Sequence, residues 1–258
     1  MIIEKSIKKQ MVTLLAEIEK KEDIHIFYAC ESGSRAWGFP SADSDYDVRF
    51  LYVHPRDWYL SLDEGPDVIE RPIDDKIDIS GWDLKKALEL FRKSNPPILE
   101  WLQSPIIYLE KSTIAQHMRK LLPEFYSPIA CLYHYLHMAQ RNFREYLKGD
   151  TVWIKKYFYV LRPILACRWI EADLGPVPME FKTLVDRTVN SKSVKVAISD
   201  LLKRKQSGEE FDRAPQIPVL SNFIESALER LEKQKFGMKK SKGDTEKLNR
   251  LFRSCLLR

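Results

Sequence analysis

The sequence lacks the patterns of membrane-embedded, secreted and zinc-binding proteins. Its four cysteines are widely separated and contain no C-x-x-C spacing, so a zinc site or a redox pair is not expected (Cys30, Cys131, Cys167, Cys255). No apolar run approaches the roughly 20 residues that span a bilayer. The first ten residues mix charged and apolar side chains and do not form a secretory signal. These absences predict a cytoplasmic protein with no membrane partner.

Charge is distributed unevenly along the chain. Residues 1–110 contain 14 Lys and Arg but 21 Asp and Glu, a net charge of −7, whereas residues 111–258 contain 28 and 16, a net charge of +12. One half that binds cations and another that binds polyanions would explain this asymmetry. The alternative is that the basic residues simply form solvated faces of helices. A chain of 258 residues is long enough for one or two domains.

Apolar patterning predicts a small sheet-containing domain followed by a helical one. A repeat of about 3.6 residues predicts a helix over 3–18. Strand patterns occur at 24–31, 45–53 and 76–82, with weaker ones at 68–73 and 106–110. Short helices are expected at 84–91 and 98–102, and longer helical patterns follow at 112–122, 128–148, 151–174, 180–189, 192–206 and 217–234. We therefore expect an α+β fold with a sheet domain at 1–110 and an α-helical domain with a basic surface at 111–258.

The segment 31–53, ESGSRAWGFPSADSDYDVRFLYV, contains the most informative chemical pattern. Gly33 allows the backbone to approach a ligand closely, and Ser34 offers a hydroxyl and an N–H for a phosphate. Asp45 and Asp47 are two residues apart at the start of a strand, so their side chains point to the same face. Two carboxylates this close repel each other unless a cation lies between them, and Mg²⁺ prefers such oxygen ligands.

Asp78 is the candidate third carboxylate. It lies in the strand pattern KIDISGW, and if that strand neighbours 45–53 the side chain would face the same pair of acids. Each feature has a structural alternative when it is taken alone. Gly33-Ser34 can be an ordinary turn, Asp43-Ser44-Asp45 a turn or helix cap, and Asp78 a charge on an edge strand. Their combination in this order favours a metal and phosphate site.

The same residues resemble the DNA polymerase beta-like nucleotidyltransferase superfamily. The resemblance rests on G-S, a spacer of about ten residues, D-x-D and a later strand aspartate, within GSRAWGFPSADSDYD. The phrases DISGWDLKKAL, KSNPPILEWL and KKYFYVLRPILACRW further resemble the RlaP-type branch associated with RNA repair. The resemblance covers about residues 25–175.

The resemblance implies a palm-like mixed sheet of five strands with helices behind it. The implied reaction transfers a nucleoside monophosphate from an NTP to a hydroxyl and releases pyrophosphate. By motif position, Gly33 and Ser34 would hold the triphosphate, and Asp45 and Asp47 would bind two Mg²⁺ ions, with Mn²⁺ as an alternative. Asp78 would bind one metal ion and help to deprotonate the acceptor.

The helical half offers a basic and aromatic pattern. In a helix over 151–174, Lys155, Tyr159 and Arg162 would fall on one face, with Lys156 beside them. Such a face can hold a triphosphate and stack a base. The alternative is that the aromatic residues form core and the lysines are solvated.

Two arginines and the acceptor leave further alternatives open. Arg35 directly follows Ser34 and is expected to reach a phosphate, whereas Arg49 would either do the same or form a salt bridge with a carboxylate. A basic helical half favours RNA ends as acceptor, although the triphosphate alone can require that charge. The alternatives are a small-molecule or protein adenylyltransferase, or a non-catalytic nucleotide- or RNA-binding module.

Overall fold

The chain folds into two compact units that are not contiguous in sequence. The computed structural model describes residues 3–63, 65–74, 76–207, 213–234, 236–237 and 243–256. Unit 1 contains Met1–Ala36, Asp45–Tyr126 and Ser241–Arg258, and unit 2 contains Trp37–Ser44 and Ser127–Lys240. These boundaries differ from the division at residue 110 that the sequence suggested, because the chain leaves unit 1 twice and returns to it twice. Among the described residues, no helix is long and apolar enough to cross a membrane.

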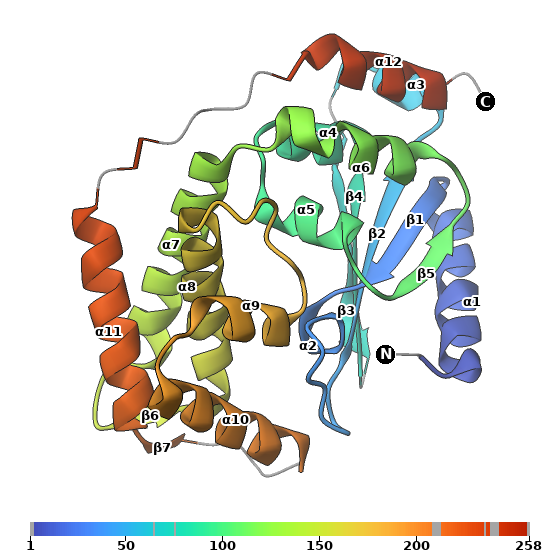
Figure 1. Ribbon diagram of the computed structural model, residues 1–258. Coiled ribbons are helices and arrows are strands. Elements are labelled where there is room, and N and C mark those ends of the chain that lie inside the picture. Colours follow the sequence, from blue (N-terminus) through green and yellow to red (C-terminus); the bar gives the residue numbers. More distant parts are fainter. Residues whose placement is uncertain are drawn as a thin grey trace. The chain divides into compact units, whose positions relative to one another are not determined.

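Unit 1 is built on a mixed five-stranded sheet (Figure 1). The strand order is β3-β4-β2-β1-β5; β2 and β4 are parallel, and the other neighbours are antiparallel. The α+β class and the mixed sheet expected from the sequence are therefore confirmed. The strands are β1 (His25–Glu31), β2 (Tyr46–Val53), β3 (Val68–Asp74), β4 (Ile77–Asp83) and β5 (Ile107–Glu110).

Helix α1 (Lys5–Glu22) covers one face of this sheet. Its buried Met11, Leu15 and Ile18 join a core cluster with alternate residues of β2, namely Val48, Phe50 and Tyr52. Because side chains alternate along a strand, Asp47 and Arg49 point to the opposite face. The same alternation in β4 places Ile77 and Ile79 against α1 and turns Asp78 away from it. Hydrophobic alternation thus determines which face carries the acids.

The remaining helices of unit 1 complete its core. Trp101 in α5 packs on Trp82 of β4 and accepts a hydrogen bond at its carbonyl from the Tyr28 hydroxyl of β1. The C-terminal α12 returns to this unit, where Phe252 packs edge-on against Tyr59 of α3. These helices are α2 (Gly33–Ala36), α3 (Arg56–Tyr59), α4 (Leu84–Arg92), α5 (Pro96–Leu102), α6 (Ile114–Phe125) and α12 (Thr245–Cys255).

Unit 2 is mainly helical. Its central helix α8 is buried along most of its length and packs against α7 and α9. The elements are α7 (Pro128–Tyr146), β6 (Thr151–Trp153), η1 (Ile154–Lys156), α8 (Tyr157–Glu171), α9 (Phe181–Thr188), α10 (Lys192–Gln206), β7 (Arg213–Pro215) and α11 (Pro218–Lys233).

The single helix predicted over 151–174 is wrong in its first six residues. Residues 151–153 form β6, which pairs antiparallel with β7, and residues 154–156 form a 3-10 turn. A β-branched and aromatic triplet, Thr-Val-Trp, suits a strand once a partner strand is present. Lys155 and Lys156 therefore precede α8 and do not share a regular helical face with Tyr159 and Arg162.

Candidate functional site

The G-S motif occupies the turn between β1 and the single-turn helix α2. Gly33 has a φ of 58°, in the left-handed region that favours glycine. A Cβ at this position would lie 1.9 Å from Oδ2 of Asp47 and 2.6 Å from its Cγ. The Asp47 carboxylate therefore packs directly against the Gly33 backbone. Ser34 follows within α2 and is half-buried.

Asp47 and Asp78 are direct neighbours across the parallel pair of β2 and β4. Both point away from α1, and their side chains are 28% and 32% exposed. Asp45 precedes β2 by one residue and is exposed. The structure thus brings Asp47 and Asp78 together near the start of the two paired strands, with Asp45 two residues before Asp47 in the chain.

Arg49 bridges the two strand carboxylates. Its guanidinium lies 2.6 Å from Oδ2 of Asp78 and 3.5 Å from Oδ1 of Asp47. It also donates hydrogen bonds to the backbone carbonyls of Val48 and Asp78, at 3.0 and 3.1 Å. Of the two readings that the sequence left open for this arginine, the salt bridge is the one that the structure contains.

Burial and the neighbouring carboxylates both act on Asp47. Burial is the main cause that raises the pKa of Asp47, and repulsion from Asp78 and Asp45 raises this pKa further, whereas Arg49 and Arg35 oppose the increase. A cation between the acids would relieve the same repulsion. Within the described part of the chain, no group of three or more His, Cys, Asp or Glu is already arranged to hold a metal ion. The oxygen donors fit a hard divalent cation in kind, while two of them face a guanidinium.

Glu31 accepts a hydrogen bond from the backbone of Asp47, and it was not among the site residues predicted from the sequence. It is fully buried at the end of β1; one carboxylate oxygen accepts the Asp47 N–H at 2.9 Å and the other accepts the Tyr108 hydroxyl. Burial raises the pKa of Glu31 to about 7. An available signal was its place in the sequence: a carboxylate that ends an apolar strand immediately before S-G-S must find internal partners.

Arg35 is oriented by the motif itself. Its guanidinium stacks on the Tyr46 ring at 3.9 Å, and its Nε donates to the Asp45 carbonyl at 3.2 Å. These contacts hold a positive charge beside the start of β2.

The loop Trp37–Ser44, which connects Gly33-Ser34 to Asp45-x-Asp47, belongs to unit 2. Within that unit Trp37 lies under the guanidinium of Arg162 at 4.9 Å and edge-on to Tyr159 at 5.8 Å. Arg162 is only 3% exposed, whereas Tyr159 is 45% exposed. The ammonium of Lys156 lies 4.6 Å from the Tyr159 ring centre, and burial is the main cause that lowers its pKa. Lys155 is exposed.

Comparison with known proteins agrees with the motif reading. The family model described as RlaP, RNA repair pathway DNA polymerase beta family, matches residues 7–254. The chain is similar to the uncharacterized protein YcgL of Bacillus subtilis (strain 168), with 51% identity over 246 residues and 95% of each chain covered. It is also similar to a solved nucleotidyltransferase-like protein from Exiguobacterium sibiricum 255-15, with 14% identity, 88% of this chain and 73% of that chain covered, and a TM-score of 0.31, which is too low to establish a shared fold. The resemblance drawn from the motifs is confirmed: the chain belongs to the RlaP family of DNA polymerase beta-like nucleotidyltransferases.

Proposed function

We propose that the chain transfers a nucleoside monophosphate from an NTP to a hydroxyl acceptor and releases pyrophosphate. The observation that carries the proposal is the pairing of Asp47 with Asp78 on one face of the sheet, with the Asp47 carboxylate packed against Gly33. This arrangement supports a reaction in which oxygen ligands and a phosphate-binding turn act on the same group. It rests on unit 1 alone.

In the proposed reaction, the acceptor oxygen forms a bond to the α-phosphorus of the NTP. The bond between that phosphorus and the oxygen bridging to the β-phosphorus breaks, and its electron pair leaves with pyrophosphate. The acceptor proton passes to Oδ1 of Asp78, which has no hydrogen-bond partner among the described residues, while Oδ2 is held by Arg49. A carboxylate held by one oxygen and open at the other is suited to accept a proton in a fixed direction.

We assign Asp45, Asp47 and Asp78 as the side chains that would hold two Mg²⁺ ions, or Mn²⁺ in their place. Such ions neutralise the triphosphate and stabilise the charge that develops on the attacking and leaving oxygens. For all three carboxylates to serve as ligands while Oδ1 of Asp78 accepts the proton, Arg49 must release Asp47 and also free Oδ2 of Asp78. The longer contact, 3.5 Å to Asp47 against 2.6 Å to Asp78, favours release on the Asp47 side.

Gly33, Ser34 and Arg35 are proposed to bind the triphosphate. Gly33 lets the Asp47 carboxylate lie directly against the turn, Ser34 supplies a hydroxyl, and Arg35 is already fixed by Tyr46 and Asp45. Lys155, Lys156, Tyr159 and Arg162 remain candidates for NTP binding. Exposure supports Lys155 and Tyr159 as direct contacts, whereas the burial of Arg162 against Trp37 supports a positioning role.

The metal and nucleotide parts of the proposal can be tested by calorimetry. NTP binding is measured with Mg²⁺ and with EDTA, using the wild type and the double variant Asp45→Asn/Asp47→Asn. A second double variant, Asp57→Asn/Asp63→Asn, removes two carboxylates of the same unit that lie outside the motif. We expect Mg²⁺-dependent binding in the wild type and in this control only. Equal binding by the wild type and the motif variant would refute the two-metal assignment.

RNA ends are the acceptor that we propose. Two observations support this choice: the description of the family names an RNA repair pathway, and residues 111–258 have a net charge of +12. Radiolabelled NTPs are offered with RNA, protein and small-molecule acceptors, and label should transfer to RNA. Affinity for RNA should also fall steeply with salt, because phosphate contacts release counterions. A flat salt dependence together with label on a small molecule or a protein would replace RNA by that acceptor.

A further inference from the structure

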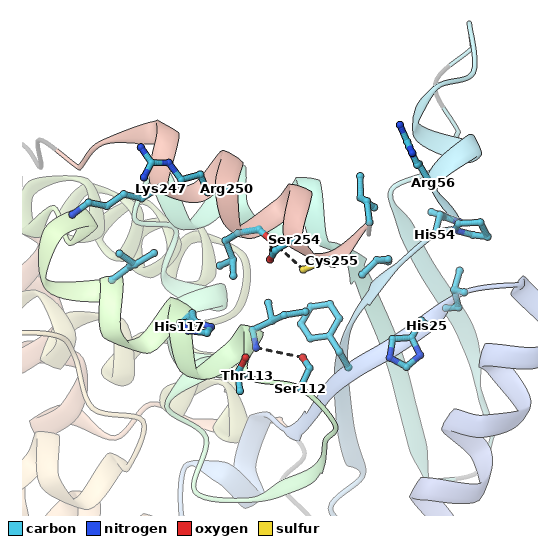
Figure 2. Close-up of a pocket in the computed structure, with 18 of the residues that line it drawn as sticks. His25, His54, Arg56, Ser112, Thr113, His117, Lys247, Arg250, Ser254 and Cys255 are labelled. Atoms are coloured by element: carbon cyan, nitrogen blue, oxygen red, sulfur yellow. Dashed lines mark hydrogen bonds between the residues drawn. The ribbon is translucent and has the colours of Figure 1, made fainter. Parts of the chain in front are cut away.

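A large cavity lies in unit 1 at the end of the sheet opposite the motif (Figure 2). Its volume is about 960 Å³, and its walls come from the start of β1, the end of β2, the start of α6 and the C-terminal α12. His25 pairs with Val53 at this end, whereas Glu31 pairs with Val48 at the motif end. Val53 lies six residue steps along β2 from Asp47, which corresponds to roughly 20 Å. The cavity is therefore separate from the carboxylates.

The floor of the cavity is apolar. Ile24, Phe27 and Val53 line it and are 8%, 0% and 7% exposed, and Leu121 and Leu251 add half-buried aliphatic surface. A surface of this kind removes a flat organic group from water. The volume lies at the upper end of the range typical of small-molecule sites, roughly 300–1,000 Å³.

The rim is cationic. Arg56, Lys120, Lys247 and Arg250 line the cavity, against one carboxylate, Asp23. Lys247 is paired with Glu124 at 2.5 Å and Arg250 with Glu246 at 4.0 Å. Arg56 and Lys120 form no ion pair with any residue that the structure describes. Figure 2 shows Arg56 on the side of β2, across from Lys247 and Arg250 on α12, so positive charges lie on two sides of the cavity lining.

Hydrogen-bonding groups interrupt the apolar surface. Ser112 and Thr113, just before α6, add hydroxyl groups to the wall. A nucleobase presents ring nitrogens and exocyclic groups that can pair with such hydroxyls, whereas an acyl chain offers them no hydrogen bond.

We propose that this cavity is a second ligand site that binds a nucleoside phosphate, with the base on the apolar floor and the phosphates at the cationic rim. The site is independent of the transfer reaction, since none of its residues belongs to the motif. Its occupant touches α6 and α12 together and so links the C-terminal helix to the sheet.

The test is calorimetry of AMP and ATP with the full chain in EDTA, which suppresses metal-dependent binding at the motif. The double variant Arg56→Ala/Lys120→Ala is compared with Arg92→Ala/Lys93→Ala, which removes the same two residue types from an exposed part of unit 1 outside the cavity. We expect the cavity variant to bind ATP about tenfold or more weakly, and the control to bind like the wild type.

Three further measurements complete the test. Asp47→Asn should bind ATP in EDTA as the wild type does; loss in this variant with full binding in the cavity variant would assign the ligand to the motif and overturn the proposal. AMP should bind about tenfold or more tightly than inorganic phosphate, and equal affinities would show that no base is recognised. Binding of oleate without ATP would replace the nucleoside phosphate by a fatty acid. Absence of ATP binding in EDTA would also overturn the proposal.

Discussion

Replacing Gly33 by alanine adds a single carbon atom, the Cβ, next to the proposed reaction centre. The backbone there has a φ of 58°, and a left-handed conformation costs a residue with a Cβ about 1–2 kcal/mol. The new Cβ would also lie 1.9 Å from Oδ2 of Asp47, where ordinary contact begins at 3.4 Å. The Asp47 carboxylate must therefore move by about 1.5 Å, and a misplacement of about 1 Å can cost roughly 100-fold in rate.

The two effects can be separated with a matched glycine. Gly175 has a φ of 84°, and a Cβ there would meet no atom within 4 Å. Gly175→Ala should therefore lose about 1–2 kcal/mol of unfolding free energy without any change at the motif. Gly33→Ala should lose at least that much and, in addition, lose Mg²⁺-dependent NTP binding and about 100-fold in transfer rate.

The assays are urea unfolding for stability and calorimetry with radiolabelled transfer for function. Stability and function are compared at a temperature where both variants are folded. If Gly33→Ala binds Mg²⁺-NTP and turns over like Gly175→Ala, the position of the Asp47 carboxylate is not critical. The assignment of Asp47 as a metal ligand would then be refuted.

Three other perturbations give distinct readouts. Asp78→Ala should keep the thermal unfolding midpoint and nearly abolish transfer of radiolabelled nucleotide; full activity would mean that Asp78 is not the third carboxylate. Lys156→Ala should weaken NTP binding about tenfold in calorimetry, whereas Lys148→Ala, an exposed control, should not; equal affinities would leave Lys156 a packing residue. Burial lowers the pKa of His54 below its ordinary 6.5. Just below pH 6.5 the imidazole is therefore protonated more fully in the unfolded chain than in the folded chain. Unfolding free energy should therefore fall as pH drops through about 6.5 in the wild type, and less so in His54→Gln; identical pH profiles by urea unfolding would exclude this contribution.

Local sequence patterns predicted most of unit 1. Strand β1 follows from a short apolar and aromatic run and β4 from apolar alternation, and the strand patterns at 45–53 and 106–110 correspond to β2 and β5. Side chains alternate between the two faces of a strand, and the strand neighbours of Asp47, Arg49 and Asp78 are apolar residues that pack toward α1. These three polar side chains therefore point away from α1. These features depend on period and composition over a few residues, which a single sequence contains.

Features that depend on distant partners could not be predicted in this way. The strand β6 exists because residues 213–215 pair with it, about 60 positions along the chain. Glu31 was missed because its function as a support depends on Tyr108 in β5 and on the N–H of Asp47 in β2. The salt bridge between Arg49 and Asp78 likewise required the parallel register of β2 and β4.

The charge asymmetry of the sequence has a different meaning in the folded chain. Lys120, Lys247 and Arg250 come from the basic half of the sequence, yet they fold with the acidic sheet in unit 1. They line the cavity, which lies roughly 20 Å from Asp47 along β2. At physiological ionic strength charges interact over about 8 Å, so these cations do little to offset the acids of the motif. Within unit 1 that task falls to Arg35 and Arg49, the two cations that act on Asp47 directly.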